Sequence, residues 1–182
     1  MKKRIYLFSI LSFLIFPEKV LSQVFKTEKG NVEFLSKASL NEFTGKSSDL
    51  NGLVDLEKNL LDFFIDLNTL RTGIGLRDRH MRENYLETKK YPYAEFTGKI
   101  GTEINLVVGQ SKSVIAKGKF KIHGVEREIE VPGKLTAISD SELQLEAKFT
   151  VLLSDYNIDI PTVVFYELAE DQIVSIRAIL KK

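Results

Sequence analysis

The chain has 182 residues, a formal net charge of +1 and no cysteine. This length is enough for one hydrophobic core and short for two, and without cysteine the fold must be held by burial of apolar side chains rather than by disulfides. A nearly neutral chain without basic clusters also argues against nucleic acid as a partner, because neutralisation of phosphates dominates that kind of affinity.

The N-terminal segment predicts a cleavable secretion signal. A basic start at residues 2–4 precedes an uncharged apolar run over residues 5–16. A membrane-spanning helix needs about 20 apolar residues, so this run favours a signal peptide over an anchor. We expect cleavage after Ser22, so that residues 1–22 are removed and 23–182 form a single domain with no integral membrane span. The mature chain then carries 22 basic and 24 acidic residues, a net charge of −2, and lies in the periplasm or outside the cell.

Beyond the leader the dominant period is two. Residues 143–151 alternate apolar and polar without a miss, and residues 114–122 alternate with lysines on the polar face. Such alternation places one face of each strand against an apolar interior. Turn signals separate these runs, with no helix between most of them, so we predict an all-β fold: an antiparallel meander closed into a barrel of about eight strands. Lysine and glutamate on the outward faces argue against an outer-membrane barrel, whose outer surface is apolar.

Helix is scarce in this pattern. Residues 76–86 are the best candidate, because they follow Gly73 and Gly75 and place opposite charges four residues apart at Asp78 and Arg82. A second short helix is expected after Pro161, since proline suits the first position of a helix. A plain loop is the alternative there.

Strand parity defines the expected interior of the barrel. An eight-stranded barrel is just wide enough to be filled by side chains or to hold one small ligand. Small residues at 116, 118, 133 and 147 lie among the large ones, which suits either a groove or a tapering packed core. The residues predicted to face inward are Val32, Phe34, Leu61, Phe63, Ile65, Phe96, Ile100, Phe120, Ile122, Leu145, Phe149 and Val151.

The residues available for catalysis are few. The chain has two histidines, His80 and His123, and no Gly-x-Ser-x-Gly motif to present a nucleophilic serine. It also lacks the clustered spacing of a zinc site. We therefore predict a protein that is not an enzyme, with no catalytic residue, metal or cofactor. The alternative is an enzyme in which His80 and His123 meet within hydrogen-bonding reach.

Three landmarks in order along the chain carry a resemblance to a known family. The first is the charged, glycine-broken segment 70–80, which contains Thr-Gly followed by Arg77-Asp78-x-His80; the others are Tyr91-Pro92 and Ile122-His-Gly-Val125. Together they resemble the YceI-like family. The resemblance implies a secreted bacterial β-barrel of lipocalin-like shape that holds a long apolar lipid, typically a polyisoprenoid, and it favours a cavity over a packed core.

The resulting hypothesis is an exported lipid-binding protein that carries or sequesters an isoprenoid or other long-chain lipid. Arg77, Asp78 and His80 are candidates for the polar groups at the mouth of the lipid-binding cavity. The alternative is that they fix the helix to the barrel, with an Arg–Asp pair as the simplest arrangement. A competing function is a filled barrel that acts in periplasmic interactions or stress response without a ligand. The oligomeric state is left open, a dimer included. The predicted ligand contacts are Phe34, Phe63, Ile65, Phe96, Phe120, Ile122, Leu145, Phe149, Arg77, Asp78 and His80.

Two departures from the family pattern bear on the ligand more than on the fold. Residues 26–34 lack the histidine of the family's Asp-x-x-His-Ser strand. The segment after residues 154–164 is apolar and contains Phe165, Tyr166 and Leu168, and this bulk would partly fill the tube.

Overall fold

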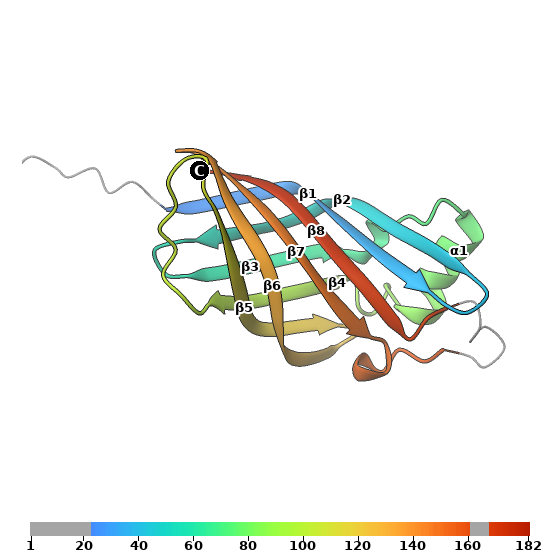
Figure 1. The fold of residues 1–182 in the computed structure, drawn as a ribbon. Helices are drawn as coiled ribbons and strands as arrows, with labels where there is room; N and C mark the ends of the chain where they lie inside the picture. The colour runs from blue at the N-terminus through green and yellow to red at the C-terminus, as the bar shows by residue number, and fades with distance from the viewer. Residues whose placement is uncertain (1–22, 161–167) are drawn as a thin grey trace, which may run out of the picture.

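The computed structural model describes residues 23–160 and 168–182. Each strand pairs antiparallel with its neighbour in sequence, and the last strand pairs back with the first, so the sheet closes into a barrel (Figure 1). The predicted closed antiparallel barrel of eight strands is therefore confirmed. The strands are β1 (Val24–Lys37), β2 (Glu42–Asp55), β3 (Leu60–Asp66), β4 (Tyr93–Ile100), β5 (Ser111–Ile122), β6 (Val125–Ser139), β7 (Glu142–Leu152) and β8 (Asp171–Lys181).

In the described residues, helical structure is confined to short segments at one end of the barrel. The helix α1 (Gly75–His80) continues directly into a π-helical turn, η2 (Met81–Tyr85), which agrees with the helix predicted over 76–86. Two short 3₁₀ turns, η1 (Leu67–Thr69) and η3 (Ser154–Tyr156), were not predicted. Most of the helix expected after Pro161 lies outside the described residues. In the described parts of the chain, no helix has the length and apolar character needed to cross a membrane.

A two-residue turn at His123-Gly124 joins β5 to β6. Both residues have positive φ, 53° and 76°, the combination that a two-residue type I′ turn requires and that matches the twist of the flanking strands. The Ile122-His-Gly-Val125 landmark of the sequence is therefore the turn between β5 and β6.

Strand parity correctly assigns the two faces of the barrel wall. Most of the predicted inward residues are at most 9% exposed, and Phe34, Phe96, Ile122 and Phe149 are half-buried and pack against the same core. On the outward face, lysines and glutamates pair across neighbouring strands, as in Lys119–Glu126 at 2.8 Å and Lys121–Glu95 at 3.0 Å. Each strand thus has one apolar and one solvated face.

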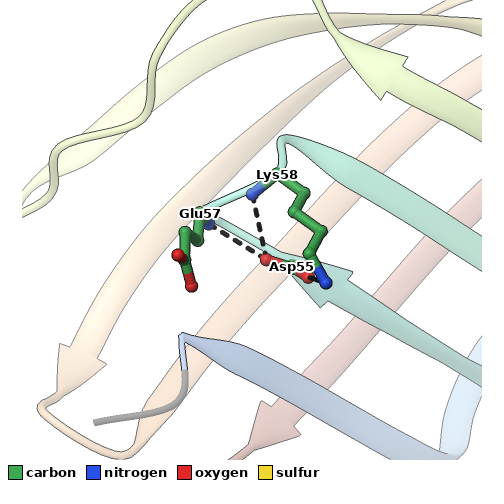
Figure 2. A network of polar contacts seen from close by, with 3 residues as sticks. All are labelled: Asp55, Glu57 and Lys58. Carbon is green, nitrogen blue, oxygen red and sulfur yellow. Dashed lines mark hydrogen bonds and ion pairs between the residues drawn. The ribbon is translucent and has the colours of Figure 1, made fainter. Parts of the chain in front are cut away.

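The two ends of the barrel differ. The start of β1, the β2–β3 turn and the end of β8 lie at one end, and α1 lies at the other (Figure 1). At the end away from α1, Val54, Leu143 and Leu180 are at most 1% exposed. The turn at this end is fixed by Asp55, whose Oδ1 accepts hydrogen bonds from the backbone N–H groups of Glu57 and Lys58 at 3.1 and 3.0 Å (Figure 2).

Candidate functional site

An apolar cavity of about 210 Å³ occupies the interior of the barrel toward the α1 end. The interior is therefore hollow in part, rather than packed throughout. Its wall includes all eight apolar residues that the sequence predicted as ligand contacts: Phe34, Phe63, Ile65, Phe96, Phe120, Ile122, Leu145 and Phe149. The cavity is larger than the roughly 150 Å³ apolar cavity that stays dry and takes up benzene in another protein.

The cavity exists because several phenylalanine rings lie along the wall instead of projecting into the centre. Phe34 pairs with Gly45 across β1 and β2, and a Cβ at Gly45 would lie 2.1 Å from the Phe34 ring. Phe63 lies over Gly52 on the neighbouring strand in the same way, at 2.2 Å. A ring that rests on a glycine occupies the space of the missing side chain, so the centre of the barrel is left open.

Arg77 is the cationic side chain at the mouth of the cavity. Its guanidinium lies over the ring of Phe43, 4.1 Å from the ring centroid, and the residue lines the otherwise apolar wall. Glu95 also borders the cavity, but its carboxylate bonds to Lys121 on the outer face. Among the described residues no carboxylate lies within ion-pair distance of Arg77, so the Arg–Asp pair expected from the sequence does not form.

Asp78 is buried and holds the loop before α1 rather than lining the cavity. Its Oδ1 accepts hydrogen bonds from the backbone N–H and the hydroxyl of Thr72, at 2.7 and 2.6 Å. Burial acts to raise the pKa of Asp78, but these hydrogen bonds, together with the positive charges of Arg71 and Arg82, bring the pKa below its ordinary value. The placement agrees with the alternative of the sequence analysis, in which this residue fixes the helix and its loop.

The two histidines lie in different environments. His80 is exposed on α1 and is not part of the cavity wall. His123 is largely buried, with Nδ1 3.0 Å from the carbonyl oxygen of Tyr156 and Nε2 2.8 Å from Oε2 of Glu87. Both ring nitrogens of His123 are thus engaged, and neither bonds to His80. Within residues 23–160 and 168–182 no three histidine, aspartate or glutamate side chains cluster as metal ligands would.

A polar cluster anchors the chain before β8 to β1. The amide Nε2 of Gln172, which lines the cavity, donates to the carbonyl oxygen of Ala169 at 2.6 Å and to the hydroxyl of Ser36 at 3.3 Å. The Ser36 hydroxyl also accepts from the backbone N–H of Ala169 at 3.0 Å. Ser36 is fully buried, so this cluster satisfies its hydroxyl, whereas Oε1 of Gln172 is buried without a hydrogen-bond partner.

Several wall residues were missed by the sequence analysis. Met81 and Tyr85 were not predicted; together with Arg77, which was, they are spaced four residues apart and line the cavity, which is the stripe that a helix facing the interior produces. The four-residue spacing could therefore have predicted which side chains of the helix face the cavity. Other missed wall residues are Phe43, Leu70, Leu86, Leu153, Ile158, Val174 and Ile176.

A closed antiparallel barrel of eight strands around an apolar cavity defines a lipocalin-like protein. Within this class, the chain belongs to the YceI-like domain family, whose model matches residues 24–178. The resemblance drawn from the sequence is therefore confirmed.

Solved structures share this fold at low sequence identity. A polyisoprenoid-binding domain from Saccharophagus degradans, implicated in plant cell wall breakdown, superposes with a TM-score of 0.76 at 19% identity, covering 88% of this chain and 99% of its own. Burkholderia cenocepacia BcnA gives 0.68 at 16% identity, covering 84% and 96%. The Campylobacter jejuni YceI protein gives 0.62 at 18% identity, covering 76% and 84%. No curated protein matches the sequence.

Proposed function

We propose that this protein binds the hydrocarbon chain of an isoprenoid or other long-chain lipid in the barrel cavity, for carriage or sequestration and without catalysis. The observation that carries the proposal is the apolar cavity, whose wall is formed almost entirely by aliphatic and aromatic side chains. The structural similarity to a polyisoprenoid-binding domain supports it.

Burial of a hydrocarbon chain is the main contribution that favours such binding. Each methylene group removed from water contributes about 0.8 kcal/mol, so a segment of ten groups contributes on the order of 8 kcal/mol. Association costs roughly 4–15 kcal/mol. Affinity therefore depends on how much of the chain is buried, and the site needs no sharp polar motif.

The size of the cavity indicates how a long lipid is held. Pockets that enclose a drug-sized ligand are typically about 300–1,000 Å³, whereas this cavity is about 210 Å³. We propose that the end of one chain lies among Phe34, Phe120 and Phe149, with the rest leaving through the mouth beside Arg77. Arg77 is then available to a polar head group, whereas Asp78 holds the loop and His80 lies outside the wall.

The proposed location is the periplasm or the exterior of the cell. This proposal is supported by the basic and then apolar N-terminal pattern of residues 2–16. N-terminal sequencing of the protein recovered from cells is expected to begin at Gln23, and a mature protein that still begins with Met1 would contradict export by a cleaved signal.

Two other functions are less well supported. A filled barrel that acts only through its surface is disfavoured by the cavity itself. An enzyme built on the two histidines would need His80 and His123 to meet, but His123 is bonded to Tyr156 and Glu87.

Native mass spectrometry followed by organic extraction tests the proposal. The purified protein is expected to carry a hydrophobic adduct, or to acquire one when a prenol such as farnesol is added. Ala147→Phe should lose the adduct while keeping the fold, because Ala147 lines the cavity and is partly exposed to it. Ile179→Phe, on the outward face of β8, is the matched control and should bind as the wild type does. A wild-type protein that carries no adduct and takes up no prenol would contradict the proposal.

A further inference from the structure

Three large apolar side chains are exposed at the α1 end of the barrel. Leu40, in the connection between β1 and β2, is 78% exposed, and Ile74 and Leu76, at the start of α1, are 50% and 54% exposed. The connection and the helix lie at the same end (Figure 1). A Cβ added at Gly73 or Gly75 would meet nothing within 4 Å, so there is open space beside the segment that carries Ile74 and Leu76.

Direct contacts hold this segment beside the start of β2. The backbones of Lys46 and Arg71 exchange two hydrogen bonds, at 2.8 and 2.9 Å, and Arg77 stacks on Phe43. Phe43 and Arg77 both line the cavity. The exposed apolar side chains therefore lie on the same two segments as these wall residues; we call Leu40, Ile74 and Leu76 the apolar rim.

The segment that carries Ile74 and Leu76 has an excess of positive charge. Residues 71–80 contain three arginines, Arg71, Arg77 and Arg79, and one carboxylate, Asp78. Asp78 is buried against Thr72 and interacts electrostatically with Arg71. With this carboxylate counted, residues 71–80 keep a net charge of +2 from three arginines and one aspartate. Apolar side chains that can enter the boundary between head groups and acyl chains, next to basic side chains, are the combination that binds an anionic bilayer.

We propose that the α1 end docks on the surface of an anionic phospholipid bilayer. The apolar rim enters the head-group region, and Arg71 and Arg79 contact lipid phosphates. In this orientation the mouth beside Phe43 and Arg77 faces the bilayer, and a lipid tail passes between bilayer and cavity without crossing water. The proposal goes beyond lipid binding in the cavity, because docking depends on surface residues that lie outside the cavity wall.

The opposite end of the barrel provides the contrast. Val107 and Val108 are also exposed there, by 66% and 50%, but neither lines the cavity. The charges of their loop are balanced, since Glu103 and Lys112 are its ionisable residues over 101–112. Exposed valines on a loop of balanced charge, which do not line the cavity, give no reason to expect bilayer binding.

Vesicle flotation with the full folded protein tests the docking proposal. We expect the wild type to float with vesicles that mix phosphatidylglycerol with phosphatidylcholine and to bind pure phosphatidylcholine vesicles far less. The triple variant Leu40→Ser, Ile74→Ser, Leu76→Ser should lower binding by more than about tenfold, and serine at position 74 suits the N-cap of α1. Arg79→Gln should lower binding by roughly fivefold. The double variant Val107→Ser, Val108→Ser is the control and should bind as the wild type does.

Three results would overturn docking: a wild type that floats with neither vesicle, a rim variant that binds as well as the wild type, or a control that loses as much binding as the rim variant. The lipid adduct of the rim variant, measured by native mass spectrometry, should persist. The two proposals can therefore be contradicted independently, because flotation tests docking and the lipid adduct tests binding in the cavity.

Discussion

The two ends of the barrel are built on the same strand pattern and are packed differently. At the end away from α1, Val54, Leu143 and Leu180 are almost completely buried and none of them lines the cavity. At the α1 end, inward residues such as Val174 and Ile176 of β8 are half-buried, because the space in front of them is open. One strand, β8, thus passes from a packed core to a cavity wall within a few residues.

The difference shows that the alternation of apolar and polar residues decides which side chains point into the barrel. The residue opposite on the neighbouring strand decides how far each of those side chains extends toward the centre. Phe34 and Phe63 have inward positions, yet each ring rests on a glycine of the neighbouring strand. The buried side chains of the packed end stabilise the fold, and the hollow end contains the candidate lipid-binding cavity.

The largest expected effect compares two residues of β8. Leu180→Ala at the packed end should lower the free energy of unfolding by about 2–5 kcal/mol, because it leaves a cavity among fully buried neighbours. Ile176→Ala at the hollow end should cost less than half as much, since its side chain already borders open space. Urea denaturation of both variants measures the difference, and equal losses would show that the two ends are packed alike.

A second variant acts on the hollow end itself. Gly45→Ala should push the Phe34 ring off the wall and into the cavity, because the nearest atoms to the new Cβ all belong to that ring. We expect a loss of stability of about 1–3 kcal/mol and a clear drop in prenol binding. Gly101→Ala is the matched control, since a Cβ there meets nothing within 4 Å. If the Gly45→Ala variant bound prenol as the wild type does, the position of the Phe34 ring against the wall would not be what keeps the cavity open.

The β5–β6 turn offers an intermediate effect. His123→Asn keeps a residue that tolerates positive φ but removes the reach to the Tyr156 carbonyl and to Glu87. We expect a loss of about 1–2 kcal/mol of stability from these two hydrogen bonds. Thermal denaturation of His123→Asn against the wild type measures it, and an unchanged midpoint would show that the two contacts contribute nothing.

The smallest effect concerns Asp78 and depends on pH. Asp78→Asn keeps an acceptor for Thr72 but removes the charge, so at neutral pH it should cost about 1 kcal/mol. The pKa of Asp78 is lower in the folded than in the unfolded chain, so its ionised form stabilises the fold above the unfolded pKa, and this is lost as the pH falls through the folded pKa. The difference between wild type and Asp78→Asn should therefore shrink in acid. A difference that stays constant with pH would contradict the assignment.

The sequence predicted the closed barrel, the helix before β4 and the inward residues, because a period of two and a charged, glycine-broken segment are local signals. It did not predict the direction of the Phe34 and Phe63 rings, which depends on strand register and on glycines well separated in sequence. It also paired Arg77 with Asp78, whereas Arg77 reaches Phe43 of β2 and Asp78 turns back to Thr72. Contacts of this kind are set by tertiary packing, which neighbouring residues do not encode.

The most direct test of the central claim is a crystal structure of the protein mixed with farnesol. The claim predicts continuous density for the prenyl chain inside the α1 end, among Phe34, Phe120 and Phe149, with the packed end around Leu143 and Leu180 unchanged. An interior closed by side chains, or a prenol found only on the outer surface, would contradict it.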